Sequence, residues 1–365
     1  MKVKIHQNNL KDAVDKVSQG LNNSTMPILK GIKLTAKDII KLRATDLEVD
    51  IEAVVEGEIP EEGEVVIPGI TFKQYVSKAP NDHLEIEAEN NKVTIKSNGS
   101  NTELEGWNVE EFPEKTEFDE EKSIQVSEPR LKDMLDKTSF ATSEDESKPF
   151  LCGVLFANNE SEKNKNELNI VATDTFKMSC IETGSELDEE FEVIIPNVTV
   201  STLQSLLAED EVTIYFEDNM MKFDLGDTIL ISRVIEGNFP NWRHVKPKNN
   251  PHKAKLDKEE LKSALERVLL LAEDDVVYMD INEDRFKLMN GNNTKGQTVE
   301  KLPHDFKGDS LQISINGKYL LNFIKQSDEE VVLSGMGSMK PFKFQELDNS
   351  EWCGVIMPVR TQGGQ

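Results

Sequence analysis

The sequence has few residues of the kinds that mark secreted, membrane-spanning or basic proteins. Its 365 residues include only 3 cysteines and 6% aromatic residues, and 42 Lys and Arg stand against 68 Asp and Glu, a formal net charge of -26. No apolar run approaches the roughly 20 residues needed to cross a bilayer. The odd, scattered cysteines (Cys152, Cys180 and Cys353) favour a reduced, cytoplasmic protein. The negative charge argues against a generally basic nucleic-acid binder but allows a local basic surface.

What the sequence does contain is a threefold internal repeat. Its unit, an alternating strand followed by an amphipathic helix, occurs twice in each third, near residues 3–17, 65–76, 123–135, 193–203, 254–265 and 311–323. Each amphipathic helix must bury one stripe against a sheet. We therefore predict an α+β fold of three two-helix, antiparallel-sheet domains at residues 1–119, 120–248 and 249–365. Three unrelated domains that share an order of elements are the alternative.

The predicted helices hold a large share of the positive charge. They span residues 8–20, 71–79, 129–138, 198–207, 258–268 and 317–326. Their twelve basic and seven acidic residues give about +5 in a chain of -26. Helix propensity explains any single lysine, but together they suggest a lining that positions DNA through its phosphates without reading bases. The residues predicted to face DNA are Lys11, Lys16, Lys73, Lys78, Arg130, Lys132, Lys137, Lys258, Lys262, Lys318 and Lys325.

Several short strings, in their order and spacing, carry a family resemblance. They are Met26-Pro27-Ile28-Leu29, Ala44-Thr45-Asp46, Val171-Ala172-Thr173-Asp174, the stretch 232–240 and the tail 355–360. From Met1 to Arg360 the chain resembles the bacterial sliding clamps, the beta subunits of DNA polymerase III. The resemblance implies a non-catalytic, head-to-tail homodimer whose six domains close into a ring around double-stranded DNA. It further implies that a clamp loader opens the ring, and that the loader and DNA polymerase dock on it through short peptides.

The resemblance also implies a peptide pocket between the second and third domains and a subunit interface. The interface would involve Leu104, Leu270 and Leu271. Met and branched aliphatic walls make an adaptable apolar slot, and Lys177 and Arg360 could hold polar peptide groups at its rim. Without the resemblance, Met357-Pro358-Val359 would be interpreted as an ordinary C-terminal strand. The pocket residues are Leu151, Thr173, Thr175, Phe176, Lys177, Met178, Pro240, His244, Val245, Val355, Met357, Pro358, Val359 and Arg360.

Catalytic and metal sites are not predicted. Asp46 and Asp174 occupy matching positions in two repeats, so each is expected to cap a turn rather than to act as an acid or base. The segment from Asp280 resembles the start of a calcium loop, but Arg285 stands where that loop requires glycine. No nucleophile–base set and no zinc spacing is found. We therefore expect no cofactor, no metal and no catalysis.

Three functions remain open. The first is a DNA sliding clamp. The second is a hydrolase or transferase with a dispersed, unrecognised active site. The third is a diverged clamp-like protein, from a phage, a plasmid or a second gene copy, that sequesters clamp partners without efficient loading on DNA.

Overall fold

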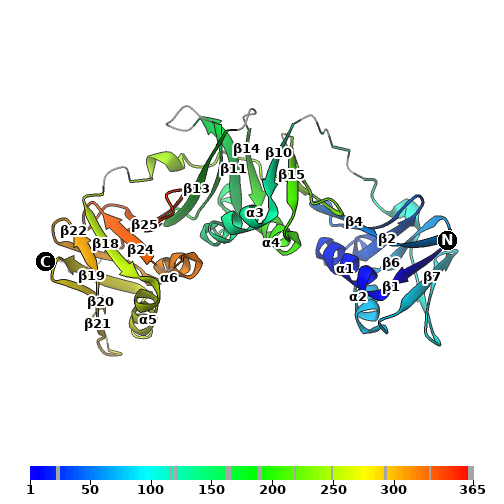
Figure 1. The fold of residues 1–365 in the computed structure, drawn as a ribbon, viewed down its shortest axis with the longest axis horizontal. Helices are drawn as coiled ribbons and strands as arrows, with labels where there is room; N and C mark the ends of the chain where they lie inside the picture. Colours follow the sequence, from blue (N-terminus) through cyan, green and yellow to red (C-terminus); the bar gives the residue numbers. More distant parts are fainter. Residues whose placement is uncertain are drawn as a thin grey trace. The chain divides into compact units, whose positions relative to one another are not determined.

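The computed structural model describes the chain except residues 22–24, 116, 119, 121, 161–165, 187–190, 218, 248–249, 292–293, 329 and 361–365. The described residues form two compact units, one of Met1–Leu131 with Ser201–Val234 and the other of Lys132–Val200 with Ile235–Gln365. Figure 1 shows the chain coloured along its sequence. No helix in the described ranges is long and apolar enough to cross a membrane.

The α-helices of the described residues fall where the periodicity predicts them. They are α1 (Gln7–Val17), α2 (Gly69–Lys78), α3 (Glu128–Asp136), α4 (Asn197–Leu206), α5 (Lys258–Leu269) and α6 (Gly317–Gln326). The stripe of α1 that carries Leu10, Val14 and Val17 is buried. Asp257 caps α5 by accepting a hydrogen bond from the Glu260 N–H at 2.8 Å, which satisfies one of the amides that a helix start leaves without a partner. The first unit pairs α1 with α2, and the second pairs α5 with α6.

The first unit contains two antiparallel sheets. One has the order β5-β1-β7-β8-β9 and the other β10-β15-β16-β17-β4-β3-β2-β6. The strands are β1 (Lys2–His6), β2 (Gly31–Ala36), β3 (Ile40–Thr45), β4 (Val49–Val55), β5 (Gly57–Glu61), β6 (Gly63–Pro68), β7 (His83–Glu89), β8 (Lys92–Ser97), β9 (Ser100–Glu105), β10 (Ser123–Ser127), β15 (Glu211–Phe216), β16 (Met220–Asp224) and β17 (Thr228–Arg233).

The second unit also contains two antiparallel sheets. Their orders are β14-β11-β12-β13-β26-β25-β24-β18-β22 and β21-β20-β19-β23. The strands are β11 (Gly153–Glu160), β12 (Asn166–Thr173), β13 (Lys177–Glu186), β14 (Phe191–Pro196), β18 (His252–Asp257), β19 (Val276–Asn282), β20 (Arg285–Asn290), β21 (Val299–Leu302), β22 (Asp305–Lys307), β23 (Leu311–Asn316), β24 (Glu330–Gly335), β25 (Phe342–Glu346) and β26 (Trp352–Ile356).

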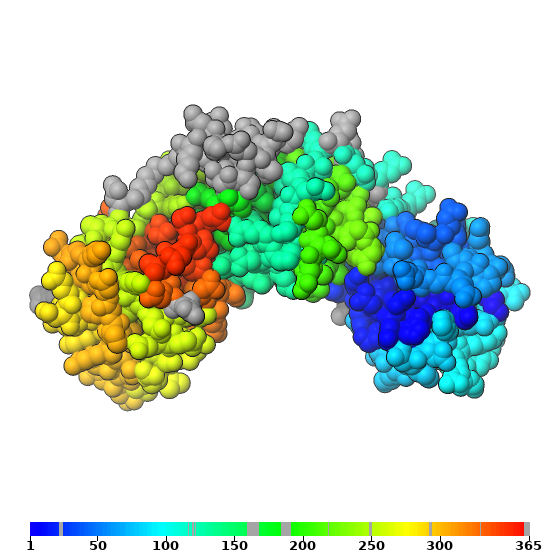
Figure 2. Space-filling model, viewed as in Figure 1, coloured from blue at the N-terminus to red at the C-terminus, as the bar shows by residue number. Residues whose placement is uncertain are grey.

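Each long sheet joins strands from two successive repeats. In the first unit β4 pairs with β17, so that Ile51 faces Leu230. In the second unit β13 pairs with β26, so that Met178 faces Val355. In the space-filling view the red residues near the C-terminus lie beside green residues of the second repeat, as this pairing requires (Figure 2). The repeats are therefore continuous through backbone hydrogen bonds rather than tethered only by linkers.

Alternating burial fixes which face of each strand points into a core. On β19 the side chains of Val277, Met279 and Ile281 are buried while their neighbours are half-exposed. A one-residue slip would turn these side chains to solvent, so the register is strongly specified. Near α6, Phe323 and Trp352 belong to an aromatic cluster with a ring-centroid separation of 6.2 Å.

Candidate functional site

The turn between β12 and β13 organises one side of the candidate site. Asp174 Oδ1 accepts hydrogen bonds from the backbone N–H groups of Phe176 (2.8 Å) and Lys177 (2.7 Å). Thr173 Oγ1 donates to the Lys177 carbonyl at 2.8 Å, and Thr175 has a φ of 77°. Asp174 therefore caps this turn, as predicted, and the turn leaves the Phe176 side chain 60% exposed.

Beneath the turn lies an apolar floor. Met178 and Val355 face one another across β13 and β26 and are buried. They belong to a core cluster that includes Phe239 and Trp242. Leu151, another predicted wall residue, is also fully buried. The floor is thus part of the hydrophobic core and is held by a strand pair.

A second group of predicted pocket residues is exposed, and we call this group the apolar rim. Phe176, Val245 and Met357 are large apolar side chains that remain exposed. The Met357 N–H donates to the Phe176 carbonyl at 2.8 Å, which holds the two segments together. The remaining predicted pocket residues of the rim are exposed or half-buried and are Thr175, Pro240, His244, Pro358, Val359 and Arg360. We call the rim and floor together the docking surface; exposed apolar surface of this kind suits a peptide partner.

Lys177 does not lie at the rim, contrary to the prediction. It is only 8% exposed, its Nζ lies 2.5 Å from Asp174 Oδ2, and it sits 4.6 Å from the centroid of the Tyr319 ring. A buried ammonium needs a counterion, and Asp174 supplies it. Lys177 therefore stabilises the turn, and Arg360 remains the exposed cation of the pair.

Most of the basic residues predicted to face DNA lie on exposed or half-buried helix positions, where several also form ion pairs. Lys11 contacts Asp15 at 2.7 Å, and Lys16 contacts Asp227 at 2.9 Å. Lys318 contacts Asp275 at 3.0 Å. Such exposed pairs are weak. The helix faces therefore carry a diluted positive charge. The residues predicted to face DNA that lie at exposed or half-buried helix positions are Lys11, Lys16, Lys73, Lys78, Arg130, Lys132, Lys258, Lys262, Lys318 and Lys325.

Lys137, predicted to face DNA from the helix 129–138, is the exception, because it lies beyond the end of α3 and is buried. Helix α3 ends at Asp136, and the Lys137 side chain is only 9% exposed. Its Nζ lies 3.4 Å from Glu346 Oε2 and 5.3 Å from the centroid of the Trp352 ring. The carboxylate and the aromatic ring favour this buried position because they compensate the lost hydration of the charge.

The three residues predicted at a subunit interface lie at exposed or edge positions. Leu104 is half-buried on β9, which ends the five-stranded sheet of the first unit. Leu270 directly follows α5 and is 77% exposed, while Leu271 is half-buried. The four-stranded sheet of the second unit ends at β21. Both β9 and β21 thus present an edge with no partner strand among the described residues.

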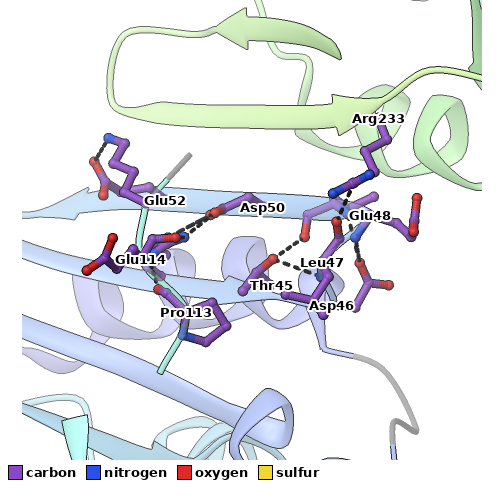
Figure 3. Close-up of polar contacts among 12 residues, drawn as sticks. Thr45, Asp46, Leu47, Glu48, Asp50, Glu52, Pro113, Glu114 and Arg233 are labelled. Carbon is purple, nitrogen blue, oxygen red and sulfur yellow. Dashed lines mark hydrogen bonds and ion pairs between the residues drawn. The ribbon is translucent and has the colours of Figure 1, made fainter. Parts of the chain in front are cut away.

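The sequence analysis missed a buried polar cluster in the first unit (Figure 3). Arg43 Nε lies 2.9 Å and 3.0 Å from the two Asp50 carboxylate oxygens. Its Nη atoms donate to the carbonyls of Pro113 (2.8 Å) and Glu114 (2.9 Å). The pairing anchors the segment that leads from the first repeat to the second. An arginine in the apolar strand 40–45, followed by an aspartate in the strand 49–55, is the signal that could have revealed it.

The neighbouring carboxylate of Glu52 is part of the same anchor. Burial raises its pKa, but hydrogen bonds and charges from Lys41 and Lys115 outweigh burial, so the pKa of Glu52 lies below its ordinary value. Lys115 Nζ lies 3.0 Å from Glu52 Oε1. Among the described residues no group of three or more His, Cys, Asp or Glu side chains is arranged to hold a metal ion.

Comparison with known protein families finds three matches that together span nearly all of the chain. Models of the N-terminal, central and C-terminal domains of the DNA polymerase III beta subunit match residues 1–116, 125–241 and 243–360, respectively. The chain is 31% identical over 356 residues to the beta sliding clamp of Staphylococcus aureus (strain Mu50), covering 93% of each.

Solved structures agree with this result. The DNA polymerase sliding clamp of Bacillus subtilis aligns with a TM-score of 0.93 at 26% identity and covers 99% of this chain and 100% of that one. The sliding clamp of Bartonella birtlesii bound to griselimycin has the same TM-score, identity and coverage. The similarity therefore extends over the whole architecture.

Proposed function

The chain belongs to the DNA polymerase III beta-subunit family, the non-catalytic sliding clamps of DNA replication, and from this premise we propose that two copies close into a ring around duplex DNA. The observation that carries the proposal is the pair of open sheet edges at β9 and β21. The competing interpretation as a hydrolase or transferase is excluded by the family.

The internal repeat supplies a partner for each open edge. Strands β4 and β13 end the four-stranded halves contributed by the first and second repeats, and they pair with β17 and β26 of the following repeat. Strand β21 has the place of β4 and β13 in its own half-sheet, and β9 has the place of β17 and β26. The same rule therefore pairs β21 of one subunit with β9 of another, head to tail.

The repeat also predicts the register of that pairing. Thr102 on β9 faces Ile95, as Leu230 on β17 faces Phe223. Across the existing junction, Leu230 faces Ile51. In the third repeat, Asn290 on β20 has the place of the buried Ala44 on β3, and Ala44 faces Ile51 on β4. The Thr298 N–H donates to the side chain of Asn290 at 2.7 Å. Thr298 therefore lies beside Asn290 and has the place of Ile51. We therefore propose that Thr102 of one subunit faces Thr298 of the other.

A disulfide-crosslinking experiment tests this register. In a Thr102→Cys/Thr298→Cys chain, oxidation should convert most of the protein to a covalent dimer closed at both interfaces. The pair Thr102→Cys/Val299→Cys is the matched control, since a one-residue shift turns the second cysteine to the opposite face. Equal crosslinking of both pairs, or none in either, would contradict the proposed interface.

We propose that the basic helix faces line the ring and contact DNA weakly through phosphates. Their cations are partly neutralised by nearby acids, which suits a protein that must slide rather than grip. The test is loading of the Lys78→Glu/Lys325→Glu chain, which should load less and show a shallower salt dependence than the native chain. The control, Lys30→Glu/Lys340→Glu, makes the same charge change at exposed positions outside the α-helices and should load normally.

Topological retention distinguishes a clamp from a sequestering decoy. The Thr102→Cys/Thr298→Cys ring, loaded in its reduced form and then oxidised, should stay on a nicked circular DNA and leave when the circle is linearised. A decoy would not be retained on the circle. This measurement also tests the proposed partners, because loading requires a clamp loader. The scattered cysteines support the proposed cytoplasmic location.

We propose that the docking surface binds short peptides of the polymerase and loader subunits. Its support is an exposed apolar rim and a buried floor, both in one unit. Met357→Ala should weaken peptide binding about tenfold, or about 1.4 kcal/mol, without loss of folding, since Met357 is already 37% exposed. Met339→Ala removes a comparably exposed methionine outside this surface and should leave affinity unchanged. Equal effects of the two would overturn the assignment.

A further inference from the structure

Two cysteines of the second unit lie opposite one another on neighbouring strands. Cys180 on β13 and Cys353 on β26 are direct partners in the strand register. The Cys180 thiol donates to the Cys353 carbonyl at 3.5 Å. Directly opposed residues of an antiparallel pair have Cα atoms about 4.5–5.5 Å apart, a separation that falls within the range of disulfides. The strands need not move apart or slide for the two sulfurs to be joined.

The surroundings of the pair restrict which oxidant can reach it. Both side chains are almost fully buried in the cluster that contains Met178 and Val355. Such a site excludes bulky disulfides, so an oxidant that reacts there must be small. The half-buried alternative, Cys152, is a poorer nucleophile because burial and the charges of Asp145 and Glu146 raise the pKa of its thiol.

We propose that Cys180 and Cys353 are a modification site at which hydrogen peroxide forms a reversible cross-strand disulfide that staples β13 to β26. The inference rests on strand register and burial, and it does not depend on the proposed function. Its effect is local to the second unit, where β13 and β26 join the half-sheets of two successive repeats. On the same strands, Met178 and Val355 of the docking-surface floor are two residues away from Cys180 and Cys353, respectively.

The chemistry balances with peroxide as the only co-reactant. The Cys353 thiolate attacks one peroxide oxygen, the O–O bond breaks, and the departing hydroxide takes up a proton to become water. Cys180 then attacks the sulfur of the Cys353 sulfenic acid, the S–O bond breaks, and the leaving hydroxide takes the Cys180 proton. Two thiols and one peroxide yield one disulfide and two waters. Interaction with the Cys180 side chain lowers the pKa of Cys353, whereas interaction with the Cys353 side chain and burial raise the pKa of Cys180, in keeping with this order of attack.

The experiment uses the full chain with Cys152→Ser, so that only the buried pair remains, and about one equivalent of peroxide. We expect an intact-mass loss of about 2 Da, reversed by reductant, and a linked peptide pair containing Cys180 and Cys353 on digestion. A mass gain of one or more oxygens without a linked peptide would overturn the proposal, as would no change in mass. Two variants that each remove one cysteine of the pair are the controls, Cys353→Ala and Cys180→Ser; the second is included in case the first alters core packing. Both should lose the 2 Da change.

A second measurement tests the staple itself. Amide hydrogen exchange of β13 and β26 should slow by about tenfold or more in the oxidised chain, because local opening of the strand pair is then restricted. Exchange in β19 and β20, in the separate four-stranded sheet of the same unit, should not change. Disulfide formation with unaltered exchange in β13 and β26 would overturn the stapling role.

Discussion

The two Ala-Thr-Asp turns share one backbone design and differ in everything packed around it. Asp46 Oδ1 accepts from the N–H groups of Glu48 (3.0 Å) and Val49 (2.7 Å) (Figure 3), as Asp174 does from Phe176 and Lys177. The residue directly after each aspartate has a positive φ, 78° at Leu47 and 77° at Thr175. The turn is thus a property of the repeat.

The surroundings decide what each turn borders. Asp50 follows the first turn and binds Arg43, whereas Met178 holds the equivalent place after the second and faces Val355. The Arg233 N–H donates to the Glu48 carbonyl at 2.9 Å, just as the Met357 N–H donates to the Phe176 carbonyl at 2.8 Å. In the first unit alone, the side chain at this place also contributes, because Arg233 Nε donates to the Leu47 carbonyl at 3.1 Å. One junction is closed by a buried ion pair and the other keeps an exposed apolar rim. Function therefore follows side chains placed on a repeated backbone.

The strongest way to break this comparison is Arg43→Met. Asp50 would remain buried without its partner, which should cost about 3–5 kcal/mol of unfolding free energy. Urea denaturation of the full chain, followed with a probe in the first unit, measures the unfolding free energy. The double variant Arg43→Met/Asp50→Leu should recover most of the loss, and a single variant as stable as the native chain would refute the role of the pair.

A smaller difference should separate the two capping aspartates. Asp174→Ala removes two turn hydrogen bonds and also strands Lys177, which is 8% exposed, so we expect a loss of about 3 kcal/mol. Asp46→Ala removes the corresponding turn bonds and should cost about 1–2 kcal/mol. Denaturation of both variants checks the order, and equal losses would mean that Lys177 does not depend on Asp174.

Acid should weaken the first junction through Glu52. Its folded-state pKa is lowered, so its contribution is complete above the unfolded pKa of about 4.3 and disappears as pH falls through the folded value. The stability difference between the native chain and Glu52→Gln should therefore be constant near neutral pH and shrink as the pH falls below about 4.3. A difference that does not vary with pH would rule out this linkage.

The smallest effect concerns backbone strain. Thr175 is β-branched and has a φ of 77°, a region that such residues rarely adopt. Thr175→Gly should stabilise the chain by at most about 1 kcal/mol, since relief of strain exceeds the added chain entropy. Leu47→Gly also loses the apolar contacts of a side chain that is 48% exposed and should be close to neutral. A destabilised Thr175→Gly variant would show that its side chain contributes more than the strain costs.

The helices could be predicted from the sequence because their signals are local. Period and capping residues place α5 within a residue of its predicted end, while α2 begins at Gly69, two residues before the predicted start, because helix ends have few internal hydrogen bonds. Lys137 was misplaced because the helical pattern continues past Asp136, where α3 ends. The apolar floor at Met178 came only from family resemblance, since a buried strand looks the same with or without a docking role.

Long-range strand pairing could not be predicted. Nothing near Cys180 signals that Cys353 will lie opposite, because an antiparallel register is set by backbone hydrogen bonds between segments distant in sequence. The partners of β4 and β17 are hidden for the same reason. The Arg43 anchor to the Pro113 carbonyl depends on a main-chain atom, which has no signature in residue type.

The composition of the two open edges bears on how a single subunit would behave before it forms the proposed dimer. Strand β9 is six residues long and exposes Glu103 and Glu105, and β21 is four residues long and exposes Lys301. Short edge strands with charged side chains are poor templates for edge-to-edge aggregation. Pairing of two β9 strands would also bring their glutamate carboxylates close together, and the charge repulsion disfavours this incorrect pairing of identical edges.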